Sequence, residues 1–350
     1  MIKRVCSIIL ILASFTVFSY STSFSAENCN IVSVVYSNGV SDNKCIDKEK
    51  LVEMINEVQK KGGGYIKLGP GIFILKNPII LRNNVQIEGT DKFTILKFFG
   101  NIAFTQNEDE ILDSIIVKNL QIEISTDKEF TVFHLHGHTN CIFENIKITS
   151  NPKTTVFFIE PKGKAVPPRN AVFNTYRNIY VTECGKCVIY NGDGIPPKEP
   201  FAVISNNVWE NIIFRKVYIK AIEAIKWVDS EKWYNLYAQA FDENVILIDL
   251  NLSRDTWMQV DRFHFYSPTL VYTPQLKKSK QKPIAIRLGK GVAKVFVKGV
   301  ITDKIWDNFL IDDGATSYYV EVDSSGIGNI LKNLEMIIYK KNIKFYEELK

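Results

Sequence analysis

Hydrophobic and polar positions along the chain follow two different periods. From residue 51 to residue 58, aliphatic residues recur at the i, i+3, i+4, i+7 spacing of one helix face. These residues are Leu51, Met54, Ile55 and Val58. We expect the helix to begin near Asp47 and to end at the glycines 62–64, since Asp caps helix starts and Gly closes helix ends. Beyond these glycines, short β-rich runs alternate with Gly, Pro and Asn, which predicts strand, turn and strand again.

A six-residue pattern recurs four times in the middle of the chain. It reads aliphatic or aromatic, any residue, Asn, Ile or Leu, any residue, aliphatic or aromatic. Its asparagines are Asn119, Asn145, Asn178 and Asn211, and weaker copies flank them at Asn84 and Asn244. By subtraction, these asparagines lie 35, 26, 33, 33 and 33 residues apart. A fixed motif at a variable interval indicates stacked units whose loops differ in length.

Such units predict an all-β fold, a right-handed single-stranded parallel β-helix (solenoid) with an N-terminal capping α-helix. One coil cannot bury its apolar side chains alone, so coils stack about 4.8 Å apart and share a core. Asn tolerates left-handed backbone and can bond to the Asn of the next coil, so the four asparagines should form a ladder. A leucine-rich repeat would need a helix in each unit, and a propeller would need four strands in each blade. The chain shows neither pattern.

The N-terminal coil carries a family resemblance. The predicted helix, the segment from Gly62 to Phe73 and a strand ending in residues 84–90 resemble the first coil of pectin lyase-like β-helix proteins. That family includes pectate lyases, polygalacturonases, rhamnogalacturonases and phage tailspikes. The resemblance covers residues 44–97, and the repeat extends it to about residue 255. It implies a protein that acts on, or binds, an extracellular polysaccharide.

The start of the chain predicts export. Lys3 and Arg4 precede an apolar run of roughly 15 residues from Cys6 to Tyr20, and small residues then suit cleavage after Ser25. The run is short for a membrane span, which needs about 20 apolar residues. We expect the processed protein to be secreted or periplasmic and not embedded in a membrane.

The predicted domain organisation is simple. A signal peptide spans 1–25, and a single β-helix domain spans 26–350. Within it, the N-terminal cap and first coils span 44–97, regular coils span 98–255, and degenerate coils with a tail span 256–350.

Charge argues against a nucleic-acid partner. Loss of Lys3 and Arg4 with the signal changes the formal charge from +5 to +3, because residues 1–25 contain no acidic side chain. A basic stripe is missing, and the lysine-rich run 276–282 is interpreted as a solvated loop. The sequence does not give the oligomeric state.

Cysteines suggest disulfides in an exported protein. Cys29 and Cys45 would close a loop of about 15 residues, worth about 3 kcal/mol in the chain-entropy model, and we predict that bridge. The spacing of Cys184 and Cys187 is that of a zinc half-site or a redox pair. A second C-x-x-C, which would support such a site, does not accompany them. A local disulfide or two buried thiols is favoured, and one cysteine is left over.

The catalytic motifs of the resembling family are scattered. Residues 191–193 resemble the Asn-Thr-Asp motif of polygalacturonases, but no adjacent aspartates follow one coil later, and the Gly-His-Gly counterpart at 136–138 precedes this segment instead of following it. The acidic calcium site and the arginine base of pectate lyases have no clear counterpart either. We therefore transfer no family site and predict no cofactor, with Ca²⁺ considered only for a lyase.

Alignment of the strands that follow each Asn motif gives a candidate site. Their last residues form a column of His136, Glu160, Asn191 and Asp229, and Asp193 lies two residues past Asn191. Groups on neighbouring coils would be about 4.8 Å apart, near the 5 to 5.5 Å of retaining glycosidases, and two coils give about 10 Å, near the inverting spacing. Candidate catalytic residues are therefore Glu160, Asp193, Asp229 and His136. Paired carboxylates repel, so one should titrate above its usual pKa of about 4. Polar strand ends that merely face solvent are the plain alternative.

Aromatic and histidine residues extend this site. Candidate substrate-binding residues are His134, Phe158, Trp227 and Trp233, if their strand face is exposed; a core role was the alternative. His134, His136 and His138 alternate along one strand, a pattern that can bind a transition metal. Because further metal ligands are not identifiable, we predict an ordinary solvent face and no metal site.

Two functions from different classes remain. The first is a glycoside hydrolase or polysaccharide lyase, and it is favoured slightly. The second is a non-catalytic glycan-binding or cell-surface protein that keeps the β-helix without a catalytic site.

Overall fold

The computed structural model describes residues 29–36, 41–47, 49–162, 168–192, 202–250, 260–273, 283–302, 306, 308–322 and 338–340. This part of the chain is mostly β-strand, with one α-helix and long parallel sheets, so the fold is all-β. The predicted signal at 1–25 and the lysine-rich run 276–282 lie outside the described residues.

The α-helix of the described part is α1, Leu51–Lys60. Its buried residues are Leu51, Met54, Ile55 and Val58, so the predicted apolar face is confirmed. The predicted start near Asp47 is wrong, because Asp47 ends strand β2 (Ser41–Asp47) and pairs with Cys29. At ten residues α1 is too short to cross a membrane, and the described residues contain no other α-helix.

The turn after α1 depends on glycine. Gly63 has a φ of 95°, and a Cβ at this position would lie 2.3 Å from the backbone oxygen of Asn84. Both the left-handed backbone and the close approach therefore exclude a side chain.

An antiparallel hairpin precedes the helix. Strand β1 (Cys29–Tyr36) pairs with β2 and, on its other side, with β3 (Gly64–Leu68). The register sets Cys45 opposite Ile31 and Cys29 opposite Asp47, so the two cysteines hold diagonal positions on one face of the pair. Their side chains lie outside the described ones, and the Cys29–Cys45 disulfide stays a prediction.

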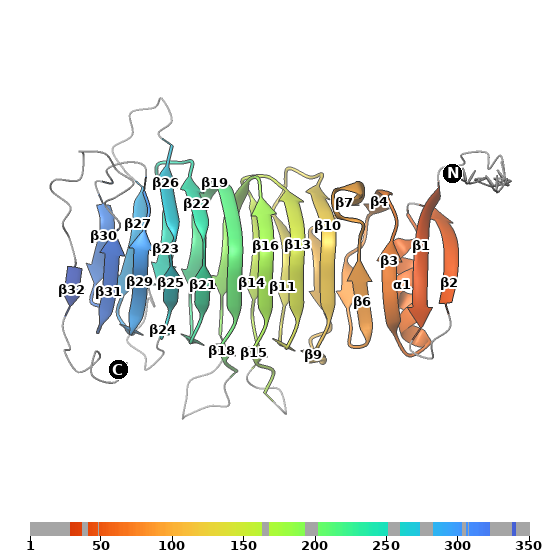
Figure 1. Cartoon of the computed structure of the whole chain (residues 1–350), viewed down its shortest axis with the longest axis horizontal. Coiled ribbons are helices and arrows are strands. Elements are labelled where there is room, and N and C mark those ends of the chain that lie inside the picture. Colours follow the sequence, from red (N-terminus) through yellow and green to blue (C-terminus); the bar gives the residue numbers. More distant parts are fainter. Residues whose placement is uncertain are drawn as a thin grey trace, which may run out of the picture.

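Parallel pairing joins successive repeats into three long rows of strands. Figure 1 shows successive strands side by side along the long axis of the molecule. The first row consists of β3, β6 (Val85–Glu88), β10 (Ile116–Ile124), β13 (Ile142–Thr149), β16 (Thr175–Val181), β19 (Val208–Ala224), β21 (Lys232–Tyr234), β25 (His264–Tyr266), β29 (Val295–Val300) and β31 (Tyr318–Val322). The second row consists of β4 (Gly71–Leu75), β7 (Thr94–Phe98), later parts of β10, β13, β16 and β19, then β22 (Tyr237–Ala240) and β26 (Thr269–Tyr272).

The third row carries the candidate site described below. It consists of β5 (Ile79–Leu81), β8 (Ile102–Gln106), β11 (Phe130–Leu135), β14 (Thr154–Ile159), β17 (Cys184–Tyr190), the end of β19, β23 (Ile246–Leu250), β27 (Ile284–Gly289) and β30 (Asn308–Asp313).

Short elements complete the fold. Two-residue strands form a separate parallel sheet of β9 (Leu112–Asp113), β12 (His138–Thr139), β15 (Ala171–Val172), β18 (Ile204–Ser205), β20 (Val228–Asp229), β24 (Val260–Asp261) and β28 (Val292–Ala293). A 3₁₀ turn, η1 (Asp91–Phe93), precedes β7, and β32 (Ile338–Lys340) pairs antiparallel with β31.

The core consists of columns of apolar side chains in register between repeats. The largest column belongs to the first row and contains Phe143, Tyr176, Trp209, Trp233 and Phe265. Ring centroids of Tyr176 and Trp209 are 3.7 Å apart, and those of Trp209 and Trp233 are 4.5 Å apart. Because aromatic side chains bury the largest apolar areas, this column is a main source of stability.

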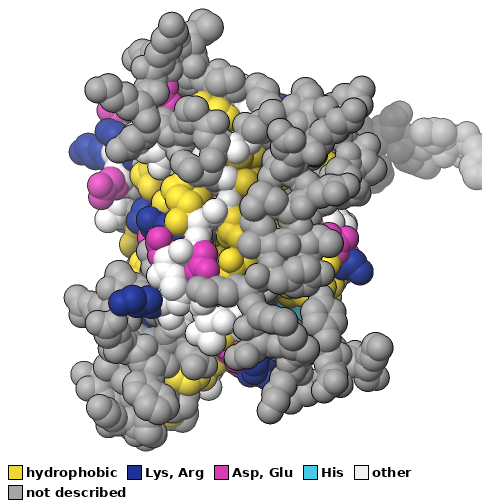
Figure 2. Space-filling model, turned by 90° about the vertical axis from the view of Figure 1, so that its left-hand side faces the viewer, with side chains coloured by type: hydrophobic (Ala, Val, Ile, Leu, Met, Phe, Trp, Pro, Cys, Tyr) yellow, Lys and Arg dark blue, Asp and Glu magenta, His cyan; other side chains and the backbone are white. Residues whose placement is uncertain are grey.

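Hydrophobic packing continues to the last described strands. Phe309 on β30 and Val320 on β31 are still buried. Figure 2 looks onto this end of the molecule and shows hydrophobic side chains of the described residues beside acidic and basic ones.

An outer ladder of asparagines links the repeats. The Nδ2 of Asn145, Asn178 and Asn211 donates to the Oδ1 of the preceding asparagine at 2.9, 2.9 and 3.0 Å, starting from Asn119. Their φ angles of 53° to 59° are left-handed. The prediction that the two weaker copies of the motif continue the repeat is wrong. Asn235, rather than Asn244, extends the ladder, because its Nδ2 donates to Asn211 Oδ1 at 3.0 Å. Asn84 is not a member either, because Asn119 donates to Glu88 instead.

A second polar column, which the sequence analysis did not anticipate, runs through the interior. It contains Cys141, Asn174, Asn207 and Glu231, each four residues before a ladder asparagine. Asn174 Nδ2 donates to Asn207 Oδ1 at 2.8 Å, and Asn207 Nδ2 donates to Glu231 Oε1 at 2.7 Å. This column satisfies polar groups inside the core and ends at a fully buried carboxyl group.

Glu231 has further partners in the core. Its Oε2 accepts hydrogen bonds from Trp209 Nε1 at 3.0 Å and Tyr190 Oη at 3.1 Å. Burial raises the pKa of Glu231 to about 7, although these hydrogen bonds favour the ionised form.

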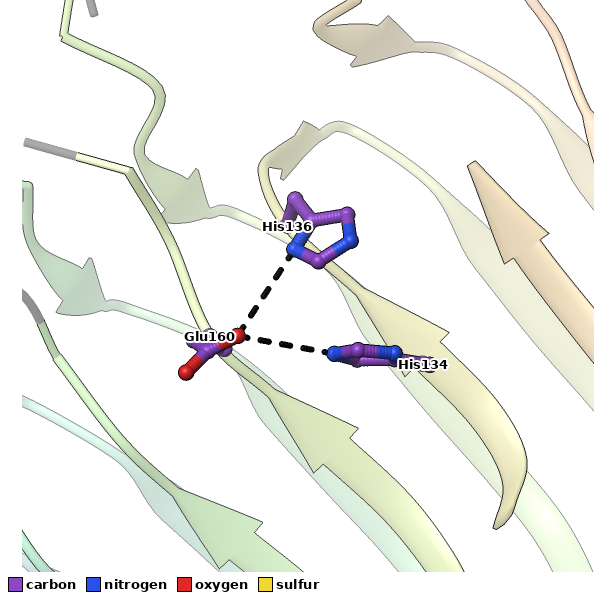
Figure 3. Close-up of side chains that lie close together, drawn as sticks. All are labelled: His134, His136 and Glu160. Carbon is purple, nitrogen blue, oxygen red and sulfur yellow. Dashed lines mark ion pairs between the residues drawn. The ribbon is translucent and has the colours of Figure 1, made fainter. Parts of the chain in front are cut away.

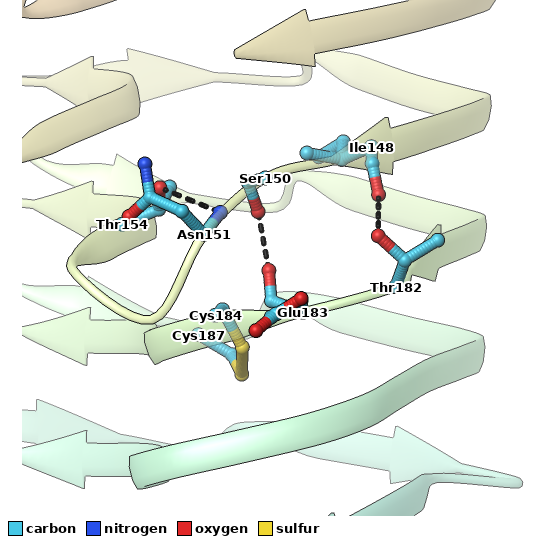
Figure 4. Close-up of a disulfide and its surroundings, with 8 residues drawn as sticks. All are labelled: Ile148, Ser150, Asn151, Thr154, Thr182, Glu183, Cys184 and Cys187. Atoms are coloured by element: carbon cyan, nitrogen blue, oxygen red, sulfur yellow. Dashed lines mark hydrogen bonds between the residues drawn. A yellow bond between two sulfur atoms is a disulfide. The ribbon is translucent and has the colours of Figure 1, made fainter. Parts of the chain in front are cut away.

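Cys184 and Cys187 form a disulfide at the start of β17, as the favoured interpretation of C-x-x-C allowed (Figure 4). Both cysteines are buried where the pairing register with β19 shifts. A Cβ at the intervening Gly185 would lie 2.4 Å from the Pro152 carbonyl oxygen, so the bend needs glycine. Cys141 is the free cysteine of the described residues, and it is buried.

Candidate functional site

The third row of strands ends in a line of polar residues. Leu135 on β11 pairs with Ile159 on β14 in parallel register. The alignment continues past the strands, because the Glu160 N–H donates to the Leu135 carbonyl at 2.8 Å and the Asn191 N–H to the Ile159 carbonyl at 2.9 Å. His136, Glu160 and Asn191 therefore stand at the same level in neighbouring repeats.

The side chains of His134 and His136 both face one carboxylate oxygen of Glu160. Glu160 Oε2 is 3.5 Å from His134 Nε2 and 3.9 Å from His136 Nδ1 (Figure 3). The two imidazoles lie two residues apart, so the alternation of a strand places them on one side, with ring centroids 4.4 Å apart. Three groups that can transfer protons or bind metals thus share one small space.

Glu160 has two more partners. Lys162 Nζ lies 3.1 Å from Oε2, and Asn191 Nδ2 donates to Oε1 at 3.0 Å. Asn191 therefore holds one oxygen, while the other faces Lys162 and both imidazoles. The side chains of His134, Glu160 and Lys162 are 22%, 26% and 31% exposed, whereas that of His136 is 4% exposed. Solvent reaches the cluster mainly through His134, Glu160 and Lys162.

The surroundings lower the pKa values of His134, His136 and Glu160. Burial lowers the pKa of His136 to about 4, helped by the nearby charges of His134 and Lys162. Burial also lowers the pKa of His134, against the opposing effect of Glu160. For Glu160, burial disfavours the ion, but the Lys162 ammonium and the His134 contact outweigh it and lower the pKa. At neutral pH the cluster contains a carboxylate, an ammonium and two neutral imidazoles. The expectation of a raised carboxyl pKa does not hold for Glu160.

Phe158 lies beside this cluster. It pairs in register with His134, and their rings stack with centroids 5.0 Å apart. Trp227, which the sequence alignment placed next to Phe158, is elsewhere: Ile189 and then Glu223 continue that column. The alignment was shifted by four residues, because β19 runs without a break to Ala224 and Tyr190 pairs with Ala224.

The same shift removes Asp229 from the column. It belongs to β20 in the short sheet, where it pairs with Ser205 and Asp261. Arg262 holds its carboxylate through Nε and Nη2 at 2.9 and 2.6 Å. Asp229 therefore belongs to another sheet and is paired with Arg262, so its predicted place in the column with Glu160 is wrong.

Two further candidates have different outcomes. Trp233 is 1% exposed and stacks between Trp209 and Phe265, so it is a core residue and not a sugar platform. Asp193 lies outside the described residues, and its role stays a prediction.

His138 does not share the surface of the other two histidines. It belongs to β12, beyond the bend at Gly137, and is fully buried with its Nε2 hydrogen-bonded to Tyr176 Oη. The period of two does not continue through the bend, so the expected line of three histidines is wrong.

Ion pairs continue the outer face of the third row, and the sequence analysis missed them. Lys186 and Lys220 contact Glu223, and Lys220 and Arg287 contact Asp249 at 2.5 and 2.6 Å. Lys162 was missed as well, because its approach to Glu160 depends on the path of the chain after β14. The cluster thus lies at one end of a longer line of ion pairs, in which Asp249 is buried.

Comparison with models of known protein families gives no match for the chain, and none of the curated proteins is similar enough to count as a relative.

The arrangement supports two kinds of chemistry. A neutral imidazole can accept a proton, and an adjacent carboxylate stabilises the imidazolium that results. The same nitrogen and oxygen atoms are also ligands that transition metals bind.

Proposed function

We propose that this chain forms a right-handed parallel β-helix of the pectin lyase-like kind, is exported from the cell, and acts on an extracellular polysaccharide. The parallel rows support the fold, because each repeat adds strands to the same rows as its neighbours. The left-handed asparagines that bond from one repeat to the next support it further. Export rests on the basic and apolar pattern of residues 1–25.

The cluster of His134, His136 and Glu160 is the proposed reaction site. Hydrolysis by two carboxyl groups needs a partner for Glu160, and Asp229 does not stand level with Glu160, because it belongs to the short sheet. Elimination, as in a polysaccharide lyase, needs instead a base that removes a proton from the carbon next to a uronate carboxylate. The observation that carries this choice is a neutral imidazole held 3.5 Å from an ionised carboxylate.

The steps of such an elimination can be assigned to groups of the cluster. His134 is the more exposed imidazole, and with Nε2 turned to Glu160 its Nδ1 accepts the proton. The electron pair of the broken C–H bond forms a C=C bond, the glycosidic C–O bond breaks, and the leaving oxygen takes a proton from water. Lys162, 31% exposed, is placed to attract the uronate carboxylate.

Glycan binding without catalysis is the second candidate, and one observation favours it. Aromatic side chains occupy outer positions of the first row in its later repeats, where Tyr234 and Tyr266 follow Glu210 in register. Tyr234 stacks on Tyr266 with centroids 4.9 Å apart, and Phe296 stacks on Tyr319 at the same separation. Rings of this kind are common where proteins contact sugars.

A product assay tests the proposed activity. The full exported chain is incubated with a panel of acidic and neutral polysaccharides, and both new reducing ends and the ultraviolet absorbance of unsaturated uronates are recorded. We expect unsaturated products from a uronate polymer, and a loss of about 10² to 10⁴ in rate for His134→Ala.

Matched controls separate the site from the fold. Glu144→Gln changes another partly exposed glutamate, which pairs with Arg177 on the first row, and should leave the rate unchanged. Reducing ends without unsaturated products would replace elimination by hydrolysis. No product from any polymer, together with retained glycan affinity, would favour the binding protein.

A further inference from the structure

We propose that His134, His136 and Glu160 bind a divalent first-row transition cation, with Zn²⁺ as the probe. The proposal rests on the geometry of the cluster alone, so it does not require that the chain act on a polysaccharide. It goes beyond the sequence analysis, which predicted no metal site.

The donor atoms select the class of cation. Two imidazole nitrogens and one carboxylate oxygen suit zinc, iron and similar metals, whereas Ca²⁺ and Mg²⁺ prefer ligand sets made of oxygen. Three protein ligands with a solvent-accessible side match sites that leave a coordination position open.

The spacing of the donors fits such a cation. Bonds of about 2.0 to 2.2 Å in a tetrahedral site set ligand atoms roughly 3.3 to 3.6 Å apart. Glu160 Oε2 is 3.5 Å from His134 Nε2 and 3.9 Å from His136 Nδ1, and all three atoms lie within 4.8 Å of one another. Small side-chain rotations therefore close the site around an ion (Figure 3).

The two imidazole nitrogens that face Glu160 indicate a shared binding partner. His134 Nε2 and His136 Nδ1 are buried atoms without a hydrogen-bond partner in the described part of the chain. Buried polar atoms are nearly always paired, and each such exception needs a physical reason. A cation between them and the carboxylate supplies one bond to each nitrogen.

Neighbouring residues already support the carboxylate. Asn191 donates to Oε1, which leaves Oε2 directed at the histidines, as residues behind a metal ligand commonly do. Lys162 contacts the same Oε2 at 3.1 Å and is the competitor of the cation for this oxygen. Its side chain is 31% exposed, so it can turn toward solvent when the ion enters.

Zinc titration of the full chain, free of any histidine tag and stripped of metal, tests the proposal. Calorimetry should give one equivalent of Zn²⁺, and Co²⁺ should give the visible absorption of a low-symmetry site. His134→Ala and Glu160→Gln should each weaken binding by about 100-fold or more. Both side chains are partly exposed, so these variants avoid the packing loss expected for the buried His136.

Two further variants sharpen the result. His264→Ala removes a histidine from β25 in another row and should leave the affinity unchanged. Lys162→Met should bind Zn²⁺ as tightly as the wild type or more tightly, because it removes the competing ammonium. The proposal is overturned if the wild type binds no Zn²⁺, or if His134→Ala and Glu160→Gln bind it as the wild type does.

Binding is measured without polysaccharide, so the metal site and the proposed activity can fail separately. A cation bound to Nε2 of His134 leaves the imidazole proton on Nδ1, the nitrogen that accepts the substrate proton in the proposed elimination. Proton abstraction by His134 and metal binding are therefore competing uses of the cluster, and Zn²⁺ should inhibit the elimination.

Discussion

Two glutamates, one at the edge of the third row and one in the core, show opposite behaviour. Glu160 is partly exposed beside Lys162, and its pKa is lowered. Glu231 is fully buried among neutral donors, and its pKa is raised to about 7. A cation next to a carboxylate outweighs partial burial, whereas neutral hydrogen bonds do not outweigh complete burial. The first region is therefore suited to bind charge, and the second to hold the repeats together.

Removal of each carboxylate in turn gives the strongest test of the difference between Glu160 and Glu231. Glu231→Leu leaves Asn207, Trp209 and Tyr190 without their acceptor inside the core, so we expect a loss of about 3 to 5 kcal/mol in the free energy of unfolding. Chemical denaturation measures it. Glu160→Leu is the matched variant, and it should cost about 1 kcal/mol or less, as partly exposed ion pairs do. Equal losses would erase the distinction between the two regions.

The pH dependence of stability should differ in sign between the two sites. The pKa of Glu231 rises from 4.5 to about 7 on folding, so its contribution is complete below about pH 4.5 and is lost as the pH rises toward 7. At 1.36 kcal/mol for each unit, the change is at most about 3 kcal/mol. Glu160 has a lowered pKa in the folded chain, so it stabilises the fold above the pKa that it has in the unfolded chain. This stabilisation is lost as the pH falls.

Each glutamate is isolated by subtracting its own glutamine variant from the wild type in unfolding experiments across about pH 2 to 8, because the Glu160 effect lies below its unfolded pKa and the Glu231 effect lies above it. Curves with the same slope for Glu231→Gln and Glu160→Gln would contradict the assignment.

A smaller effect than that of Glu231→Leu is expected at the outer ladder. Asn178→Leu should destabilise the chain by about 1 to 3 kcal/mol, because it removes the bonds to Asn145 and Asn211 and places a branched side chain at a φ of 54°. These bonds are exposed, so strain accounts for much of the loss. Asn178→Gly keeps the left-handed backbone without the bonds, and a thermal midpoint equal to that of Asn178→Leu would remove strain from the explanation.

The outer asparagine ladder could be predicted from the sequence, whereas the inner polar column could not. Asn178 and Asn211 belong to a local motif whose turn conformation depends on the residue itself. Asn174 and Asn207 stand four residues earlier and were equally visible, but their inward direction depends on the bend between the short sheet and the first row. Glu231 was harder still, because only its three distant donors make a buried carboxyl group tolerable.

The candidate site was predictable in part for a similar reason. His136, Glu160 and Asn191 follow strands of similar length, so aligning the strand ends sets them level. The next repeat differs, because β19 continues for 17 residues and the polar residue chosen by pattern, Asp229, falls in another sheet. The approach of Lys162 to Glu160 depends on the path of the chain after β14, which residue pattern does not give.

The direction of the terminal strands limits how copies of this protein can associate. At one end of the first row β1 runs antiparallel to β3, and at the other end β32 runs antiparallel to β31. Outside β1, strand β2 runs in the direction of the row again, so the reversed strand is outermost only at the β32 end. A second molecule that approached the β32 end would meet a strand of reversed direction, so the parallel register between repeats cannot continue there. Open strand edges are templates for aggregation, and the reversed strand β32 acts against growth from this end into fibres.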